Sequence, residues 1–446
     1  MRKVITYGVF DLFHDGHRKL LERARALGDY LIVGITDNIY DEERGKFGTV
    51  DPYEVRAANV RATGFADEVI PETHFGQKTE DVLKYGIDVF TVGSDWVGKF
   101  DYLRAYCEVV YLDRTPDISS SLLRAERFPT VNLGIIGSGR ITRKFVPEAR
   151  AAGRVDVKGV YNPRLDSAVM LQSQFKLDFA TDDIDELFDR VDAIYIATPH
   201  ETHADYARAA LQAGKHVLVE KPLALSRRDA EELYALADEK GLVFLEAVKT
   251  AYCPGYQQVM DLARSGIVGE IFDVESCFTR LTLPGCRERD NTRFGGSFLE
   301  LGTYGLLPAL DLFGCEPDDV SFDVVHDANG LDLFSKVHLR FGEKYALGKA
   351  GLGVKSEGQL IISGTDGNLV VEAPWWKTGT CQVHHEDPTH VEVRQYTFAG
   401  EGLRYEISDF AHRIAGHIGR RDKMPAHMSI AMADIMERFL KGEGRA

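Results

Sequence analysis

Short, continuous apolar runs alternate with amphipathic stretches along the first quarter of the chain. The apolar runs predict strands, and the stretches between them predict helices, for example over residues 17–27 and 52–63. Because these runs are apolar throughout, they are typical of a parallel sheet that helices cover on both faces. The strands expected in this region are 3–7, 30–36, 68–70, 89–93 and 108–112.

The same alternation begins again at residue 131, which predicts a second nucleotide-binding unit of the doubly wound kind. Its expected strands are 131–136, 156–161, 193–197, 216–220 and 243–246. After about residue 250 the segments lengthen and alternate, which predicts a mixed or antiparallel sheet with one open face. The strands expected there are 271–280, 318–326, 335–341, 358–363, 368–371 and 390–396, and the helices are 254–265, 297–313, 406–416 and 427–441.

The fold class that these patterns predict is α/β, with two Rossmann-like units followed by a region built on a large, mostly antiparallel sheet. Residues 119–129 are interpreted as a short helix and an extended link that ends at Pro129. We therefore expect domains at residues 1–128, 130–250 and 251–446. The 446 residues suffice for this, since an ordinary domain takes roughly 100–200.

Composition narrows the class of protein. The chain is 44% hydrophobic and 27% charged, which is typical of a globular enzyme, and no run of apolar residues reaches membrane-spanning length. Its net charge of −16 argues against nucleic-acid binding. The six cysteines form no CxxC pair and the N-terminus lacks a secretory pattern, so we expect a reduced, cytoplasmic protein without a zinc ribbon.

The segment His14-Asp15-Gly16-His17 places two imidazoles at a strand-to-helix turn. Gly16 lets the backbone approach a phosphate, and both rings can donate hydrogen bonds to phosphate oxygens as charge develops on them. This arrangement suits attack by an incoming phosphate on the α-phosphorus of a nucleoside triphosphate. The alternative is that one histidine caps the helix and the other is a surface residue.

Residues 1–125 resemble the cytidylyltransferase family that includes glycerol-3-phosphate cytidylyltransferase. The stretches that carry the resemblance are GVFDLFHDGHRKLLERA, ERGK, PYEVRAANV, FADEVIPE, FGQKTED, GSDWVGKFD and YCEVVYLDRTPDISSS. The resemblance implies that His14 and His17 contact phosphate, Lys46 holds a phosphate group, and Arg114 binds the β- and γ-phosphates of CTP. The other residues it places around CTP are Gly8, Phe10, Asp11, Gly16, Asp95, Trp96, Thr115, Ile118, Ser119 and Ser120. Trp96 is nearly as well explained as a core aromatic.

The resemblance also implies a Mg²⁺ ion that travels with CTP, and no carboxylate cage for a resident metal is visible in the sequence. One departure from the family pattern is Asp117, which stands where the signature RTxGIS has glycine. A carboxylate beside a triphosphate is unfavourable unless it points away or meets a metal.

Gly137 and Gly139 follow the first strand of the second unit, as in a dinucleotide-binding turn. Thr142 replaces the third glycine of GxGxxG, so the motif alone is weak. The acidic residue that usually binds the ribose of NAD is missing at the end of the next strand, where Asn162 and Arg164 stand. These residues favour NADP(H) over NAD(H), although Arg164 can equally be an exposed loop residue.

The stretch ATPHETHADYARAALQAGKHVLVEKPLALS resembles the Gfo/Idh/MocA oxidoreductase family, and the resemblance extends from Thr130 to the C-terminus. It implies that Lys221 donates to the carbonyl being reduced, that Tyr304 is the proton donor with a pKa lowered by Lys221, and that Glu300 orients substrate hydroxyls or the lysine. Glu300 replaces the usual aspartate, and Ala251 stands where many relatives carry arginine.

The residues assigned to the dinucleotide surround this stretch and the glycine turn. His200 and His203 are expected beside the cofactor, and no third ligand is placed to make them a zinc site. The full set is Gly137, Gly139, Arg140, Ile141, Asn162, Arg164, Thr198, Pro199, His200, His203, Glu220 and Pro222.

Together the two resemblances predict a bifunctional enzyme that makes a CDP-activated polyol for teichoic acid or capsule assembly. A sugar phosphate would be reduced to a polyol phosphate, of the glycerol or ribitol type, and then condensed with CTP; the reverse order is less direct. One alternative is a cytidylyltransferase with a non-catalytic dinucleotide-sensing module, and another is a scaffold with two decayed sites. Both families often form dimers or tetramers, so a homo-oligomer is expected.

Overall fold

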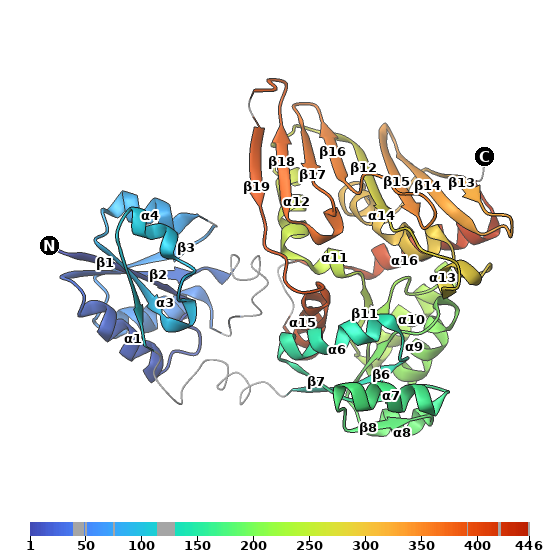
Figure 1. The fold of residues 1–446 in the computed structure, drawn as a ribbon, viewed down its shortest axis with the longest axis horizontal. Helices are drawn as coiled ribbons and strands as arrows, with labels where there is room; N and C mark the ends of the chain where they lie inside the picture. Colours follow the sequence, from blue (N-terminus) through green and yellow to red (C-terminus); the bar gives the residue numbers. More distant parts are fainter. Residues whose placement is uncertain are drawn as a thin grey trace. The chain divides into compact units, whose positions relative to one another are not determined.

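The computed structural model describes residues 1–38, 49, 51–74, 76–113, 130–389, 391–417 and 421–444. The chain divides into two compact units, Met1–Pro129 and Thr130–Ala446 (Figure 1). Each unit is α/β, as the sequence predicts. Among the described residues, no helix is long and apolar enough to cross a membrane.

The first unit is built on a five-stranded parallel sheet in the order β3-β2-β1-β4-β5. Its strands are β1 (Lys3–Gly8), β2 (Tyr30–Thr36), β3 (Glu68–Glu72), β4 (Val89–Gly93) and β5 (Glu108–Leu112). Helices α1 (Asp15–Arg25) and α3 (Tyr53–Ala62) share an apolar core with one face of the sheet, and α4 (Gln77–Tyr85) shares a core with the other. The expected coverage of both faces is therefore confirmed.

The second unit opens with a six-stranded parallel sheet in the order β11-β10-β9-β6-β7-β8. Its strands are β6 (Val131–Ile136), β7 (Val155–Tyr161), β8 (Phe179–Thr181), β9 (Ala193–Ile196), β10 (His216–Glu220) and β11 (Phe244–Ala247). Its helices are α6 (Arg140–Ala152), α7 (Leu165–Phe175), α8 (Ile184–Asp189), α9 (His203–Gln212) and α10 (Arg227–Lys240). The pattern did not predict β8, which at three residues is too short to show a period.

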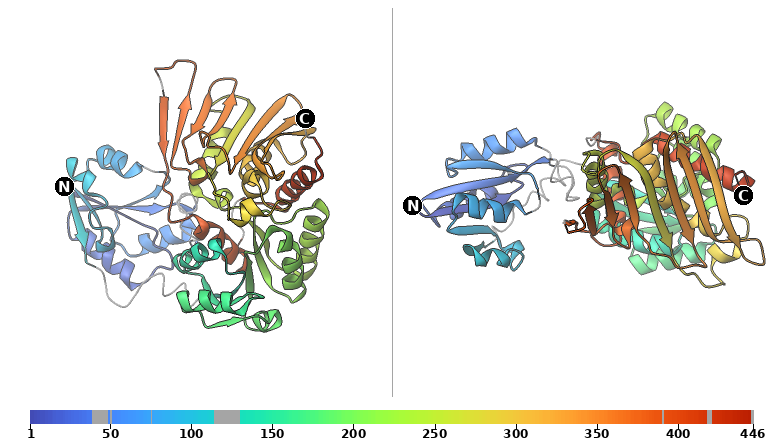
Figure 2. Two further views of the ribbon diagram at one scale, coloured as in Figure 1. Left: turned by 45° about the vertical axis from the view of Figure 1, so that its right-hand side comes forward. Right: turned by 90° about the horizontal axis from the view of Figure 1, so that it is seen from above.

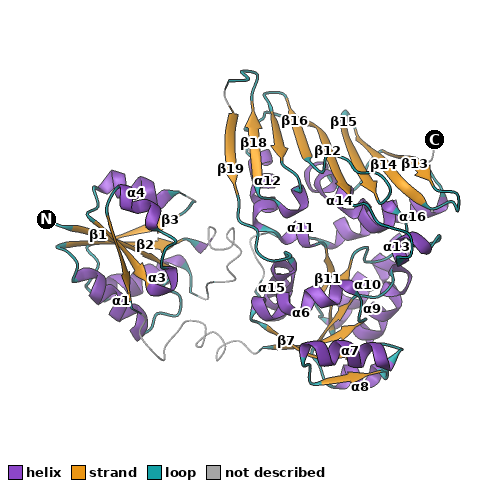
Figure 3. Cartoon of the chain, viewed as in Figure 1, coloured by secondary structure: helices purple, strands orange, loops and turns teal. Residues whose placement is uncertain are grey.

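An eight-stranded sheet completes the second unit, in the order β13-β14-β15-β12-β16-β17-β18-β19 (Figures 1 and 3). Only β12 and β15 pair in parallel among these strands, so the expectation of a mostly antiparallel sheet is confirmed. The strands are β12 (Ile271–Thr279), β13 (Asp319–His326), β14 (Asp332–Phe341), β15 (Lys344–Gly351), β16 (Leu360–Gly364), β17 (Asn368–Val371), β18 (Thr380–His384) and β19 (Val391–Gln395).

The helices of this region lie on one side of the large sheet (Figure 2). They are α11 (Lys249–Tyr252), α12 (Pro254–Arg264), α13 (Arg287–Asp290), α14 (Ser297–Phe313), α15 (Leu403–Ile414) and α16 (Ala426–Lys441). Helix α14 crosses β12, β14 and β15, and Gly305 of the helix meets Gly348 of β15 closely enough that a Cβ on either would crowd the other backbone. The pattern missed β15 and β18; the glycines that admit α14 interrupt the alternation of β15.

The last two helices return to the six-stranded sheet. Helix α15 packs against α6, and its Leu403, Ile407 and Phe410 belong to the core of that sheet. Helix α16 packs against both α10 and α14. Helix α15 begins three residues before the expected residue 406. The division of the second unit at residue 250 stays a prediction, because both C-terminal helices also support the first of its sheets.

Candidate functional sites

The first candidate site lies at the carboxyl edge of the five-stranded sheet, where the strand order reverses between β1 and β4. Such a switch point is the usual ligand site of an open parallel sheet. The segment after β1 carries Phe10, Asp11 and the two histidines, and the segment after β4 carries the turn Ser94–Trp96. Strands β1 and β4 are direct neighbours, so the fold brings these two predicted segments together.

The two histidines form a stacked pair at the start of α1. Their ring centroids are 3.9 Å apart with an interplanar angle of 18°, and the rings of Phe10 and Phe13 pack against His17. His14 is the N-cap of α1, and its Nδ1 accepts a hydrogen bond from the His17 backbone N–H at 3.4 Å. Burial lowers the pKa of His14, so this imidazole is neutral near pH 7 and meets an anion as a hydrogen-bond donor.

Buried polar contacts fix the backbone in front of this pair. The Asp11 carboxylate accepts the N–H of Asp51 at 3.0 Å. Arg56, whose side chain is fully buried, donates to the carbonyl oxygens of Val9, Thr36 and Asp51 at 2.7, 2.8 and 2.9 Å. Sequence reasoning assigned no role to Arg56, although it lies in the stretch PYEVR. It joins the end of β1 to the end of β2 and so supports the nucleotide pocket.

The other residues predicted to bind CTP fall into two groups, those within the described part of the chain and those outside it. Gly8 ends β1, Gly16 lies in the first turn of α1, and Asp95 belongs to the turn Ser94–Trp96. Trp96 packs partly buried beside the core of the α4 face, next to Phe100, so core packing accounts for at least part of its role. Six other predicted residues lie outside the described residues: Lys46, Arg114, Thr115, Ile118, Ser119 and Ser120.

The second candidate site is a cleft of about 910 Å³ above the carboxyl ends of β6, β9 and β10. Its floor begins at Gly137, whose φ of +104° favours glycine and where a Cβ would come within 2.3 Å of the Ala197 carbonyl oxygen. A Cβ on Gly139 would meet open space, since no atom lies within 4 Å of it. Thr142, in place of the third glycine, donates to the Gly137 carbonyl at 3.2 Å and closes the turn. This cradle fits a dinucleotide pyrophosphate at the start of α6.

The end of β7 carries Asn162 and Arg164, which the sequence assigned to a 2′-phosphate. The Asn162 amide donates to Ser138 Oγ at 2.9 Å, and its oxygen accepts the Arg164 N–H at 2.9 Å. Asn162 therefore braces the glycine turn with one of its two amide N–H donors. Arg164 lines the cleft with Arg140 and Arg143, so three guanidinium groups face this part of the site.

Lys221 lies deeper in the cleft, directly after β10. Its ammonium donates to the backbone carbonyl of Glu300 at 2.7 Å. The carboxylate of Glu300 instead pairs with Arg287 at 2.6 Å and approaches His200 Nε2 at 3.5 Å. The expectation that the Glu300 side chain orients the lysine is thus corrected, because the main chain of α14 makes that contact.

Tyr304 lies one turn further along α14, lining the same cleft as Lys221. Burial raises its pKa, and the nearby carboxyl groups of Glu220 and Glu406 raise it further. The expectation that Lys221 lowers this pKa is wrong, because the loss of hydration dominates at a fully enclosed phenol. Tyr304 therefore stays protonated near neutral pH, which suits a hydrogen-bond or proton donor. Its ring meets Phe278 edge-on at 4.7 Å.

The two histidines after β9 differ in their contacts. His203 is fully buried, with Nδ1 at 2.8 Å from the Pro222 carbonyl and Nε2 at 2.9 Å from the Thr198 carbonyl, so it ties together the ends of β9 and β10. His200 is also buried, and burial together with the charge of Lys221 holds its pKa well below the usual value. Both line the cleft with Thr198 and Pro199, and burial lowers the pKa of each imidazole.

Behind Lys221 stand two buried carboxyl groups that the sequence did not single out as a pair. Glu220 accepts a hydrogen bond from Tyr195 OH at 2.6 Å, and burial raises its pKa. Glu246 accepts the Leu223 N–H at 2.9 Å, and burial raises its pKa to about 7.

This shift predicts a pH dependence of stability. The folded state favours protonated Glu246, so the contribution of this group to the free energy of unfolding is greatest below about pH 4.5 and falls as the pH rises toward 7, by about 3 kcal/mol. Glu246→Gln keeps an acceptor for Leu223 and removes this term. Urea unfolding of the second unit at pH 5 and pH 7.5 measures it, and an equal loss in both proteins would contradict the assignment.

Further residues in the cleft carry charges that the sequence analysis did not use. Glu288 pairs with Arg140 and with Arg280, the latter at 3.3 Å. Lys249 follows β11 and lines the cleft together with Glu401. No sequence signal marks Glu288, Arg280, Lys249 and Glu401, since they converge from α13, the end of β12, α11 and the segment before α15.

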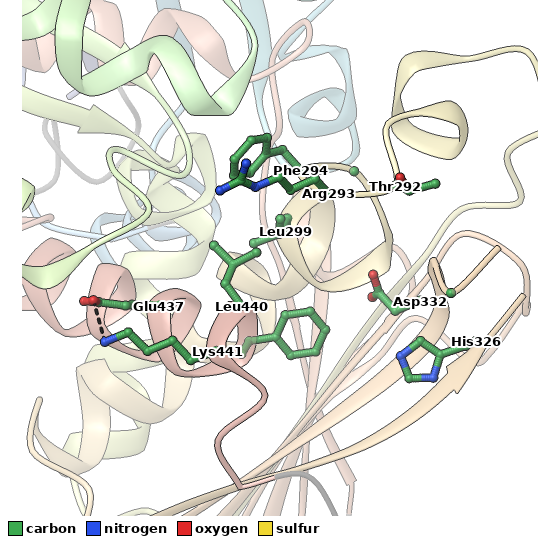
Figure 4. A pocket seen from close by; sticks show the side chains of 12 residues that line it. Thr292, Arg293, Phe294, Leu299, His326, Asp332, Glu437, Leu440 and Lys441 are labelled. Carbon is green, nitrogen blue, oxygen red and sulfur yellow. Dashed lines mark ion pairs between the residues drawn. The ribbon is translucent and has the colours of Figure 1, made fainter.

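A second cavity of about 520 Å³ lies between the start of α14, the β13–β14 hairpin and the end of α16 (Figure 4). Asp332 faces it, and one of its carboxylate oxygens accepts the Phe298 N–H at 2.7 Å and the Ser335 hydroxyl at 2.8 Å. Lys441 pairs with Glu437 at 2.8 Å. The contacts of Asp332 cap the start of α14, and the Lys441–Glu437 pair lies within α16. Both acidic groups of this cavity therefore already have a structural role.

The geometry defines two classes of site: a histidine pair at a nucleotide-binding edge, and a dinucleotide cleft with a lysine and a tyrosine at its base. Family comparisons give the same division. Residues 5–126 match the cytidylyltransferase-like family, residues 131–248 match the oxidoreductase family with an NAD-binding Rossmann fold, and residues 256–370 match the GFO/IDH/MocA C-terminal domain.

Individual relatives support both parts. Glycerol-3-phosphate cytidylyltransferase from Bacillus subtilis is 49% identical over 126 residues, which are 28% of this chain and 97% of the relative. The dTDP-3,4-didehydro-2,6-dideoxy-alpha-D-glucose 3-reductase of Streptomyces violaceoruber is 32% identical over 52% of this chain and 67% of its own length. A scyllo-inositol 2-dehydrogenase (NADP(+)) of Bacillus subtilis is 26% identical over 70% of this chain and 97% of the relative.

Among solved structures, a 3-ketoreductase from Actinomadura kijaniata in complex with TDP-benzene and NADP shares the fold. Its TM-score is 0.62 at 24% identity, covering 71% of this chain and 98% of that one. The chain therefore belongs to the cytidylyltransferase family through its first unit and to the GFO/IDH/MocA oxidoreductase family through its second. It is a bifunctional enzyme.

Proposed function

We propose that the second unit reduces a sugar phosphate with NADPH and that the first unit joins the resulting polyol phosphate to CTP. In the first reaction the carbonyl, NADPH and a proton give an alcohol and NADP⁺. In the second, a phosphate oxygen attacks the α-phosphorus of CTP, and the products are a CDP-polyol and pyrophosphate. One observation carries the proposal: a single chain holds both the His14–His17 pair and the Lys221–Tyr304 cleft.

In the reductase cleft, a bound nicotinamide supplies the hydride. Lys221 has three donors and uses one on the Glu300 carbonyl, so it can hold the substrate carbonyl oxygen without releasing α14. Tyr304, protonated because of its burial, supplies the proton that the new alkoxide takes up. Glu300, neutralised by Arg287, is placed to bind substrate hydroxyls from the opposite side.

In the transferase site, no protein nucleophile is required because the phosphate monoester already carries the attacking oxygen. His14 and His17 donate to phosphate oxygens as negative charge grows at the α-phosphorus. Asp11 and Arg56 hold the loop that presents them. Mg²⁺ would enter with CTP and offset part of the negative charge of its phosphates, and Lys46 and Arg114 would bind the remaining charge.

The names of the relatives support an alternative order of the two reactions. Relatives of the second unit are called dTDP-sugar reductases, so a nucleotide-linked sugar is the natural competing substrate. In that order the transferase acts first and the reductase works on the CDP-linked product.

A coupled assay separates these possibilities. Purified protein is given NADPH and a panel of three- to six-carbon sugar phosphates, with and without CTP and Mg²⁺, while NADPH absorbance and pyrophosphate release are followed. Our proposal predicts NADPH oxidation without CTP and pyrophosphate release that depends on prior reduction. NADPH oxidation only after CTP is added would establish the reverse order.

Cofactor choice provides a separate prediction. Arg164→Ala is expected to weaken NADPH binding about tenfold, because a charge-assisted hydrogen bond to the 2′-phosphate is worth about 1.5–3 kcal/mol. NADH binding to the same variant should change less than twofold. Quenching or enhancement of nicotinamide fluorescence measures both. Equal weakening of the two cofactors would show that Arg164 supports the loop instead of reading the phosphate.

A further inference from the structure

Three lysine side chains from separate elements meet at one glutamate on the wall of the cleft. Lys144 of α6 pairs with Glu401 Oε2 at 3.1 Å, and Lys377 approaches the same oxygen at 3.5 Å. Lys249 of α11 donates to the Glu401 backbone carbonyl at 3.1 Å. Within the part of the chain that the structure describes, Glu401 is the only carboxylate that forms an ion pair with any of these lysines.

Lys249 is the most enclosed of the three. Burial lowers the pKa of its ammonium, and among the described residues its one hydrogen-bond acceptor is a neutral carbonyl. An ammonium has three donors, so Lys249 keeps donors for a ligand in the cleft that it lines.

A nearby acid does not balance this charge. Glu406, one turn into α15, is fully buried, and neither of its carboxylate oxygens has a hydrogen-bond partner. An ionised carboxylate in that position is strongly disfavoured, and burial raises the pKa of Glu406 well above the usual value, with Glu220 adding to the shift. Even an ionised Glu406 would leave three ammonium groups facing two carboxylates, so the lysine cluster keeps a net positive charge.

Lys249 and Lys377 lie toward the eight-stranded sheet, whereas Lys144 belongs to α6, the helix that follows the glycine turn. Thr250, next to Lys249, donates to the Trp376 carbonyl at 3.0 Å. The Trp376 ring stacks on Phe278 at 3.6 Å, and Phe278 meets Tyr304. Lys377 follows Trp376 directly. Lys249 thus lines the same cleft as the proposed proton donor, and Lys377 reaches it through its contact with Glu401, while Arg140, Arg143 and Arg164 line the end of the cleft that suits the dinucleotide.

We infer that Lys249, with Lys377 and Lys144, binds the phosphate group of the sugar substrate, so that the reductase selects phosphorylated sugars. This inference rests on the proposed reduction of a sugar phosphate. The Glu401 carboxylate accepts from lysines that would also donate to a phosphate oxygen. Because Glu401 carries one negative charge against three ammonium groups, two positive charges remain to balance a phosphate dianion. Its carboxylate also competes with the ligand, which makes it a determinant of affinity.

The test compares each sugar phosphate with its unphosphorylated analogue in the NADPH-loaded full-length enzyme. Lys249→Met, which keeps the length of the side chain and removes the charge, should lower the ratio of the two kcat/KM values about 50-fold, mainly through KM for the phosphorylated sugar. Lys249→Arg should restore most of the ratio, and Glu401→Gln should lower KM for the sugar phosphate. Lys240→Met, an exposed lysine of α10, is the matched control.

A binding measurement that needs no turnover accompanies it. Inorganic phosphate is titrated calorimetrically into the NADPH-saturated protein, and Lys249→Met should weaken the binding about tenfold relative to wild type and Lys240→Met. The first unit is identical in all three proteins, so any heat of phosphate binding to that unit is the same in the three titrations. If both sugars lose activity equally, if NADPH binding weakens as much as phosphate binding, or if phosphate binding is unchanged, the inference is wrong. If the wild-type enzyme oxidises no NADPH with any sugar phosphate, the proposed function is refuted instead. The titration would still show whether the lysine cluster binds phosphate.

Discussion

Lys221→Ala is expected to lower the rate of NADPH oxidation by about 10²–10⁴ while leaving cytidylyl transfer to an added polyol phosphate at its wild-type rate. The variant loses the group that holds the substrate carbonyl oxygen and stabilises the charge that develops on it. The contact that Lys221 makes with Glu300 ends on a backbone carbonyl at the start of a long helix, so its loss should disturb α14 little. Stopped-flow absorbance of NADPH and a pyrophosphate assay follow the two activities on the same sample.

The matched control is Lys240→Ala, which removes an exposed lysine from the same unit. Both activities should survive in this control. The contrary result has two forms. If wild type itself oxidises no NADPH with any sugar phosphate or CDP-linked sugar, the second unit senses the dinucleotide instead of using it. If Lys221→Ala retains full activity, Tyr304 and the buried histidines carry the reaction alone.

His17→Ala is expected to lower cytidylyl transfer by a similar factor, about 10²–10⁴, with reduction of the sugar phosphate unaffected. The substitution removes a donor aimed at the phosphate chain and the ring that stacks on His14 at 3.9 Å. His17 is a cleaner test than His14, because His14 also caps α1 and its loss would destabilise the helix. Release of pyrophosphate from CTP measures the effect.

His74→Ala provides the control, since His74 is an exposed histidine of the same unit and pairs only at the surface with Glu80. Thermal unfolding of both variants shows whether the first unit stays folded. Wild-type pyrophosphate release from a folded His17→Ala protein would remove the histidine pair from the mechanism and leave the triphosphate to other groups.

The sequence predicted the architecture well because the strands that define it carry strong, simple patterns. The parallel strands of both units are buried on two faces and read as apolar runs, and α14 was predicted at its observed bounds. Strands β8, β15 and β18 were missed. β8, with three residues, is too short for a period, β18 has only Cys381 and Val383 as alternating apolar residues, and β15 contains Gly348, whose contact with α14 only the folded structure reveals.

The chemistry of the sites was predicted less completely. Motifs located Lys221 and Tyr304, but the pKa of Tyr304 depends on its enclosure by residues far away in sequence, and the prediction had the wrong direction. Glu300 was expected to orient substrate hydroxyls or Lys221, and its contact with Lys221 is made by the backbone carbonyl instead of the carboxylate. Lys249, Lys377 and Glu401 form no motif, since they lie on three segments that only folding brings together.

The most direct test of the central claim follows the hydride of NADPH from the reductase cleft into the CDP-linked product of the transferase site. The enzyme is incubated with NADPH carrying deuterium at the transferable C4 position, a sugar phosphate, CTP and Mg²⁺, and CDP-linked products are analysed by mass spectrometry. The account predicts a CDP-polyol that carries one deuterium on the carbon of the reduced carbonyl. CDP-linked product without deuterium, formed while the NADPH remains unoxidised, would contradict it.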